Sequence, residues 1–213
     1  MTSPDPVRAV LKVTGRELAR AAKVLGGGGV VAFPTETFYG LAVDPFNRDA
    51  LDRLFRLKKR SPEKPVLVLI DRIASLDGLV REIPDRYRKL IERFWPGPLT
   101  LVFAGREGLP SLLTDKDGTI GIRLSSHPVA RRLAAAAGGA VTGTSANPSG
   151  LPAAVSASQV EEVFPAGLDY ILDGGPVPGG LGSTIVGIED AGLKLIRAGA
   201  VPREEILGAI ADS

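Results

Sequence analysis

The chain contains no cysteine, and it has one histidine, one tryptophan and one methionine among its 213 residues. Without cysteine it can form no disulfide, thiolate metal site or cysteine nucleophile. A single histidine excludes a metal site built from several histidines and disfavours a Ser-His-Asp triad. Aromatic residues make up 5% of the sequence and hydrophobic residues 44%, so aliphatic side chains must form most of the core.

Long apolar runs are also missing from the sequence. No run approaches the length of a membrane-spanning helix, and the N-terminus holds prolines without the apolar segment of a signal peptide. We therefore expect a cytoplasmic protein with no membrane association. Since there is no long linker and no internal repeat, we expect a single domain over residues 1–213, with its core at about 14–200.

Charged residues are unevenly distributed along the chain, although the net charge is only +2. Residues 51–100 contain 12 Lys and Arg against 7 Asp and Glu, whereas residues 151–213 contain 3 against 9. The basic segment favours an anionic ligand such as a nucleotide or a nucleic acid. Basic helices are also ordinary solvated surfaces, so charge alone leaves both interpretations open.

Helical and strand patterns alternate along the chain. Thr14 and Glu17 form a predicted capping box that starts a helix ending near residue 25. The other predicted helices lie at 49–58, 84–94, 128–136, 158–163 and 202–210, and the predicted strands at 30–33, 66–70, 99–103, 119–124, 140–144, 170–172, 184–188 and 193–197. This mixture predicts an α/β domain with a large, twisted mixed sheet and flanking helices. The Gly/Pro-rich segment 174–182 is short enough to act as a mobile lid.

The stretch 33–47 carries the clearest sign of a ligand site. A predicted buried strand runs into Pro34, and Thr35, Glu36, Thr37 and Tyr39 then crowd around a glycine. Hydroxyl groups at the carboxyl end of a strand are typical of a small-molecule pocket. Taken alone, the stretch also fits a polar turn.

A basic cluster and a glycine run both invite a phosphate-binding interpretation. Lys58, Arg60 and Lys64 lie within seven residues, and such cations suit a triphosphate as well as a solvated helix end. The four glycines at 26–29 lack the Gly-Lys-Ser/Thr of a phosphate loop and precede a strand, so we interpret them as a helix stop.

Further polar residues follow predicted strands. The segment 144–147, Thr-Ser-Ala-Asn, offers hydroxyls and an amide for a ribose, a phosphate or an amino acid, or it forms an Asx or Ser turn. Arg123 and Arg197 each end an apolar strand, where a carboxylate clamp and a structural ion pair are both open. His127 precedes Pro128; a general base is one interpretation, and a residue at the start of a helix is the favoured one.

Taken in order, these pieces resemble the YrdC family, the L-threonylcarbamoyladenylate synthases. No single piece is decisive, but the ordered set is specific and spans nearly the whole chain. The matching segments are FPTETFYGL (33–41), LKKRSPEKP (57–65), FWPGPLTLV (94–102), GIRL (121–124), HP (127–128), TSANPSG (144–150), STIV (183–186) and IRAGA (196–200).

The resemblance implies a single YrdC-like α/β domain in which a large twisted sheet surrounds a basic cavity. It implies that L-threonine, bicarbonate and ATP, with Mg²⁺, react to threonylcarbamoyl-AMP and pyrophosphate. Partner proteins then transfer the threonylcarbamoyl group to tRNA, and tRNA or double-stranded RNA is a further expected partner. Longer relatives carry a second C-terminal domain, and this sequence resembles the short, single-domain form.

By position, the resemblance also implies roles for individual residues. It assigns the threonine pocket to Thr35, Tyr39, Arg123 and Thr144. It assigns the nucleotide to Lys58, Arg60, Lys64, Ser145, Asn147, Ser183 and Arg197, with Lys58 and Arg60 as the catalytic cations and no residue as a metal ligand. The sequence departs from the family at Leu69, where many members have histidine, so no role of that histidine can be transferred.

Two other functions compete with the synthase. The first is a non-catalytic module that binds double-stranded RNA or tRNA, which the basic segment supports, although shape-based RNA binding does not need this set of hydroxyls, amides and arginines. The second is carbamoyl transfer, because hydrogenase-maturation proteins contain a YrdC-like domain. Those proteins are much longer and carry zinc fingers, whereas this chain has no cysteine.

Overall fold

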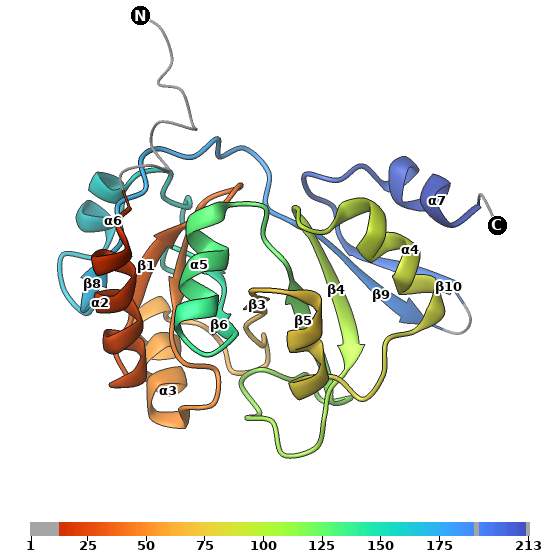
Figure 1. Cartoon of the computed structure of the whole chain (residues 1–213), viewed down its shortest axis with the longest axis horizontal. Helices are drawn as coiled ribbons and strands as arrows, with labels where there is room; N and C mark the ends of the chain where they lie inside the picture. Colours follow the sequence, from red (N-terminus) through yellow and green to blue (C-terminus); the bar gives the residue numbers. More distant parts are fainter. Residues whose placement is uncertain (1–12, 190–191, 212–213) are drawn as a thin grey trace, which may run out of the picture.

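The computed structural model describes residues 13–189 and 192–211 (Figure 1). The helices are α2 (Gly15–Gly26), α3 (Arg48–Lys58), the 3₁₀ helix η1 (Ile73–Gly78), α4 (Asp85–Phe94), α5 (Pro128–Ala136), α6 (Ala157–Val163) and α7 (Arg203–Ala211). The strands are β1 (Val31–Pro34), β2 (Tyr39–Ala42), β3 (Val68–Ile70), β4 (Leu99–Ala104), β5 (Thr119–Arg123), β6 (Ala140–Thr142), β7 (Thr144–Ser145), β8 (Tyr170–Ile171), β9 (Thr184–Glu189) and β10 (Gly192–Arg197).

The α/β class is confirmed, but the strands divide between two mixed sheets where one large sheet was expected. The first sheet has the order β7-β2-β1-β8, and the second has the order β10-β9-β4-β5-β3-β6. Both contain parallel and antiparallel neighbours: β1 pairs antiparallel with β2 and parallel with β8, while β4 pairs antiparallel with β5 and parallel with β9. Figure 1 shows the two sheets side by side.

The predicted strand 140–144 is the place where the chain passes from one sheet to the other. Its first part, β6, pairs with β3 in the six-stranded sheet, and β7 pairs with β2 in the four-stranded sheet. Gly143 lies between them, and a Cβ there would come within 2.6 Å of Leu69 Cγ and 3.0 Å of Leu67 Cδ1. A glycine is therefore required where the backbone crosses so close to β3.

Helix boundaries follow local capping chemistry. The capping box is confirmed, because Thr14 Oγ1 accepts from the Glu17 N–H at 3.3 Å and Glu17 Oε2 accepts from the Thr14 N–H at 2.7 Å. Asn47 caps α3 through its side-chain oxygen, which accepts from the Ala50 N–H. Lys59 ends α3 in the left-handed region, at φ +51°, and this turn redirects the chain into the basic cluster.

The two sheets share helical cover and a core. Helix α5 contacts β1 of the four-stranded sheet and also β3 and β6 of the six-stranded sheet, while α2 packs on α5 and α4 packs on α7. One cluster of buried apolar side chains includes Leu41 of β2 together with Leu101 of β4 and Ile122 of β5. Among the residues that the structure describes, no helix is long and apolar enough to cross a membrane.

Candidate active site

A cavity of about 630 Å³ is lined by residues of both sheets. The four-stranded sheet contributes polar groups from the β1–β2 turn and from β7, and the six-stranded sheet contributes side chains of β4, β5, β9 and β10. The segment from Arg60 to Leu67 closes a third side. Nine residues predicted from the sequence line the cavity: Thr35, Tyr39, Arg60, Lys64, Arg123, Thr144, Ser145, Ser183 and Arg197.

The hydroxyl-rich turn between β1 and β2 is held by its own hydrogen bonds. Thr35 Oγ1 donates to the carbonyl of Phe38 at 2.7 Å and lies 3.1 Å from Thr37 Oγ1, and the Thr35 N–H donates to the same carbonyl at 3.1 Å. Both threonine side chains are buried and line the cavity. The turn therefore presents fixed hydroxyl groups to a ligand.

Arg123 is the most deeply buried cation of the cavity wall. Its Nε lies 3.6 Å from Oε1 of Glu36, and within the described residues neither atom has a hydrogen-bond partner. Ser125 Oγ donates to the other carboxylate oxygen of Glu36. Burial lowers the pKa of Arg123, and the negative charge of Glu36 acts in the opposite direction. The guanidinium is thus held at the cavity with its hydrogen-bonding capacity largely unused, which suits an anionic ligand.

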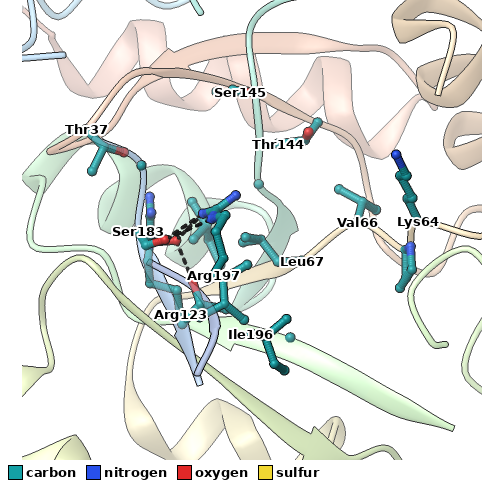
Figure 2. Close-up of a pocket in the computed structure, with 18 of the residues that line it drawn as sticks. Thr37, Lys64, Val66, Leu67, Arg123, Thr144, Ser145, Ser183, Ile196 and Arg197 are labelled. Atoms are coloured by element: carbon teal, nitrogen blue, oxygen red, sulfur yellow. Dashed lines mark hydrogen bonds between the residues drawn. The ribbon is translucent and has the colours of Figure 1, made fainter. Parts of the chain in front are cut away.

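Arg197 reaches the cavity from the end of β10 and is bound by Ser183 (Figure 2). Its Nε and Nη2 donate to the Ser183 carbonyl at 3.1 and 2.7 Å, and Nη2 also donates to Ser183 Oγ at 3.0 Å. Desolvation in the cavity, followed by the charge of Arg123, lowers the pKa of Arg197. The two guanidinium groups therefore lie within electrostatic reach of each other.

Arg60 and Lys64 belong to the loop that follows α3. Arg60 donates from Nε to the Lys64 carbonyl at 2.6 Å and from Nη2 to the Pro65 carbonyl at 2.9 Å, which fixes the loop. Burial and then the charge of Arg197 lower the pKa of Arg60. Figure 2 shows Lys64 across the pocket from Ser183 and Arg197. The cations therefore surround the cavity from different elements.

Lys58 and Asn147 are not among the residues that line this cavity. Lys58 is 2% exposed, and its Nζ donates to the carbonyls of Ser145 and Asn147. Asn147 Oδ1 accepts from Ser145 Oγ at 2.5 Å, and Asn147 Nδ2 donates to the Leu151 carbonyl. These two residues organise the 144–148 turn, and Thr144 and Ser145 are the members of the turn that line the cavity.

Tyr39 connects the cavity wall to the Gly/Pro-rich segment 174–182. Its hydroxyl donates to the Gly175 carbonyl at 2.8 Å, and burial is the main cause that raises its pKa. The same segment also donates from the N–H of Val177 to the Val155 carbonyl and from that of Gly179 to the Thr37 carbonyl. The segment therefore follows the turn that carries the threonine hydroxyls, and its action as a lid stays a prediction.

His127 has the role that the sequence favoured, at the start of a helix. Its Nδ1 accepts from the Val129 N–H at 3.3 Å and caps α5. Burial lowers the pKa of His127, with Glu36 acting in the opposite direction. Because an Nδ1 that accepts carries no proton, the cap requires the neutral imidazole.

Nowhere in residues 13–189 and 192–211 are three His, Cys, Asp or Glu side chains grouped to hold a metal ion. Of the two carboxylates that line the cavity, Glu63 and Asp115, the second accepts from the Thr119 hydroxyl and from the N–H groups of Asp117 and Thr119.

The structure adds cavity residues that the sequence analysis did not single out. Thr100 and Thr119 contribute hydroxyls from β4 and β5, and Ile185 and Ile196 form part of the apolar wall. Each lies in a strand of alternating or continuous apolar character, where a threonine is as typical of the strand itself as of a ligand site. Thr100, Ile185 and Ile196 lie in segments that match the family, but the match assigned them no role, and Thr119 lies outside those segments.

Comparisons with known proteins show the family of the chain. The Sua5_yciO_yrdC family model, described as telomere recombination, matches residues 23–199. A threonylcarbamoyl-AMP synthase of Pyrococcus abyssi is 37% identical over 186 residues, 87% of this chain and 55% of that protein. One of Stutzerimonas stutzeri is 39% identical over 73% of this chain and 83% of its own length. The corresponding protein of Bacillus subtilis is 35% identical over 92% of this chain and 57% of its own length.

Solved structures give the same result. P. abyssi Sua5 complexed with L-threonine has a TM-score of 0.86 at 36% identity, and the match covers 91% of this chain and 57% of that chain. The solution structure of MTH1692 from Methanobacterium thermoautotrophicum has a TM-score of 0.70 at 33% identity over 95% of this chain and 92% of its own. The chain spans just over half the length of the P. abyssi and B. subtilis relatives. It belongs to the Sua5/YciO/YrdC family.

Proposed function

We propose that the protein is an L-threonylcarbamoyladenylate synthase, which converts L-threonine, bicarbonate and ATP into threonylcarbamoyl-AMP and pyrophosphate. The observation that carries the proposal is the meeting of Arg60, Arg123 and Arg197 in one cavity beside threonine and serine hydroxyls. Arginine guanidinium groups suit carboxylates and phosphates. In support, several relatives are named threonylcarbamoyl-AMP synthase, and P. abyssi Sua5 has been crystallised with L-threonine.

The proposed reaction needs no nucleophile from the enzyme. The amine of threonine and bicarbonate form a carbamate with loss of water. A carbamate oxygen then attacks the α-phosphorus of ATP, and the bond from that phosphorus to the bridging oxygen breaks, so pyrophosphate leaves with that oxygen. The protein contributes by holding the two substrates in line and by neutralising phosphate charge, which suits a chain without cysteine.

Threonine occupies the end of the cavity at β5, β7 and the β1–β2 turn in this proposal. Arg123 binds the substrate carboxylate with its terminal nitrogens while Glu36 lies behind its Nε. The hydroxyls of Thr35 and Thr144 line the same end, and Tyr39 supports the wall through its bond to Gly175. This end combines a fixed cation with small polar groups, as an amino acid requires.

The ATP phosphates occupy the space between the Arg60–Lys64 loop on one side of the cavity and Arg197 on the other in this proposal. Ser145 and Ser183 add hydroxyls to the wall around that space. Lys58 and Asn147 act through the 144–148 turn, since their polar atoms bind the turn itself. We assign Mg²⁺ to the ATP substrate, whose phosphate oxygens provide its ligands.

The product is an activated acyl adenylate, so a further protein must accept it. We propose that threonylcarbamoyl-transfer proteins pass the group to an adenosine beside the anticodon of tRNA, and that the protein works in the cytoplasm with these partners. Direct contact of tRNA with this chain is part of the same proposal, because the basic segment 51–100 is compatible with a nucleic acid.

The test is pyrophosphate release from ATP and Mg²⁺, measured with bicarbonate and L-threonine present together and with each omitted. We expect release only in the complete mixture, together with an adenylate of the mass of threonylcarbamoyl-AMP. Arg60→Ala should abolish release, whereas Arg88→Ala, which removes an arginine from the exposed face of α4, should not.

The second candidate function is a non-catalytic RNA-binding module, which the basic segment favours. It predicts no pyrophosphate release by folded, ATP-binding protein. It also predicts RNA binding whose affinity falls steeply with salt, because lysines and arginines release counterions from phosphates. Release without any need for threonine would exclude both functions as stated.

A further inference from the structure

Arg197 depends on a single neighbour for its position. It lies on β10, the edge strand of the six-stranded sheet, after a register shift between Leu195 and Arg197. Within the described residues, its guanidinium makes hydrogen bonds to Ser183 alone. Gly182 allows this approach, because a Cβ there would lie 3.3 Å from Arg197 Nη2. Nη1, which makes none of these bonds, stays available to a ligand.

Ser183 in turn is bound to the centre of the sheet. Its Oγ lies 2.8 Å from Oγ1 of Thr100, and both side chains are 1% exposed. Thr100 belongs to β4, which has β5 on one side and β9 on the other. Hydrogen bonds thus connect Thr100 on an interior strand, through the Ser183 hydroxyl, to Arg197 on the edge strand.

The direction of the hydrogen bond between Ser183 and Thr100 has two possibilities, whereas that between Arg197 and Ser183 has one. Arginine is only a donor, so Ser183 Oγ accepts from Nη2. If Ser183 donates its own hydrogen to Thr100, its oxygen becomes a better acceptor for Arg197, since hydrogen bonds in a chain polarise one another. If Thr100 donates, its hydrogen still fixes the direction in which Ser183 Oγ points. In both cases Thr100 restricts Ser183.

We propose that Thr100 is a positioning residue for the synthase reaction: through Ser183 it holds the Arg197 guanidinium with its free edge toward the phosphates. The proposal rests on the proposed function. It gives Thr100 no contact with the reacting atoms. The proposal assigns no such role to Thr142, another buried threonine. Thr142 does not line the cavity, and its Oγ1 accepts from the Val43 N–H.

The test compares variants that differ in one hydroxyl. Thr100→Ser and Thr100→Ala both lack the methyl group, and only the serine keeps the hydroxyl; Thr100→Val keeps the shape and lacks the hydroxyl. We expect roughly 5- to 10-fold lower turnover for the alanine and valine variants and near wild-type turnover for the serine variant. The KM for L-threonine should stay within about twofold, because Arg123 is unchanged. Thr142→Val controls for the loss of a buried hydroxyl and should leave turnover unchanged.

A double-mutant cycle tests whether Thr100 acts through Ser183. Thr100→Ala should have little further effect in a Ser183→Ala background, because the hydroxyl that it restrains is absent. Equal turnover of the serine and alanine variants would overturn the proposal, and so would losses that simply multiply in the double variant.

A readout without turnover separates this proposal from the proposed function. Calorimetric titration with inorganic pyrophosphate should show several-fold weaker binding to Thr100→Ala than to Thr100→Ser. If the wild type makes no adenylate but this difference is present, the synthase function fails and the positioning role stands. If the wild type is active and both variants bind pyrophosphate equally, the positioning role fails alone.

Discussion

Among the cavity residues, the arginines differ in what holds them. Arg60 binds carbonyls of its own loop, and Arg197 binds Ser183. Arg123 instead faces the carboxylate of Glu36 across 3.6 Å. Its terminal nitrogens are therefore the strongest candidates for a bidentate contact with a substrate carboxylate, a geometry that lysine cannot reproduce.

We expect Arg123→Lys to raise the KM for L-threonine by roughly 10- to 100-fold, because one charged hydrogen-bonding group is lost from a buried contact. The KM for ATP should change much less. Steady-state pyrophosphate release at varied threonine, with calorimetric binding of L-threonine, measures the effect. An unchanged threonine KM in folded Arg123→Lys would remove Arg123 from the threonine site.

The contribution of Lys58 to the stability of the folded protein should depend on pH. Burial, followed by the charge of Arg60, lowers its pKa to about 7 from the model-compound value of 10.5. Between these values the unfolded chain binds more protons at this site than the folded protein does, so the contribution of Lys58 to stability should rise as the pH increases from 7 to 10.5. Two N–H groups of a neutral amine still suffice for the carbonyls of Ser145 and Asn147.

Urea unfolding of the wild type and of Lys58→Met at several pH values measures this contribution. The unfolding free energy of the wild type minus that of Lys58→Met should increase from pH 7 to pH 9.5. Lys23→Met, at an exposed position of α2, provides the control and should show a nearly constant difference. A value of this difference for Lys58→Met that decreases as the pH rises would contradict the prediction.

At the scale of elements, the crossing between β6 and β7 positions Thr144 and Ser145 for the cavity. Gly143→Ala places a Cβ 2.6 Å from Leu69 Cγ, so we expect a loss of about 1–3 kcal/mol in unfolding free energy together with reduced activity. Gly208→Ala is the matched control: a Cβ there meets nothing within 4 Å inside α7, and helix propensity predicts a gain of up to about 1 kcal/mol. Chemical denaturation of both variants measures the contrast.

The sequence predicted most elements within a few residues, and its omissions have local causes. β2 was missed because all four of its residues are buried, so the run Tyr-Gly-Leu-Ala lacks the alternation of a half-exposed strand. The predicted strand 140–144 covers β6 and the first residue of β7. No local sequence pattern indicates that these neighbouring segments pair in different sheets. Between the predicted strands 184–188 and 193–197, residues 190 and 191 lie outside the described residues.

The site was predictable where a residue's chemistry is rare in its surroundings. Arg123 is a charged residue at the end of an apolar strand, and it lines the cavity. Lys58 was also conspicuous, but the sequence could not tell a phosphate contact from a buried cation that serves two carbonyls. Thr100 lies in the matching segment 94–102, but no role was predicted for it, because a threonine in a strand is ordinary.

At the scale of the whole molecule, the two sheets share one apolar cluster, and α5 contacts both. We therefore expect a single cooperative unfolding transition, although the strands form two sheets. Fluorescence of Trp95, which is buried in that cluster, should change together with far-UV circular dichroism of the whole chain. Separate midpoints for the two signals would show that the sheets unfold independently and would contradict the single-domain prediction.

The crowding of cations in the cavity has a consequence for the evolution and engineering of this protein. Burial lowers the pKa of both Arg60 and Arg197, and the charge of Arg197 adds to this effect at Arg60 while the charge of Arg123 adds to it at Arg197. The cations therefore repel one another, and a bound anion relieves that repulsion. Replacing one of these arginines with a neutral residue should make the empty protein harder to unfold while removing the thermal protection given by pyrophosphate. A screen for heat resistance alone would therefore select against the site, and only a screen that also demands ligand binding would preserve it.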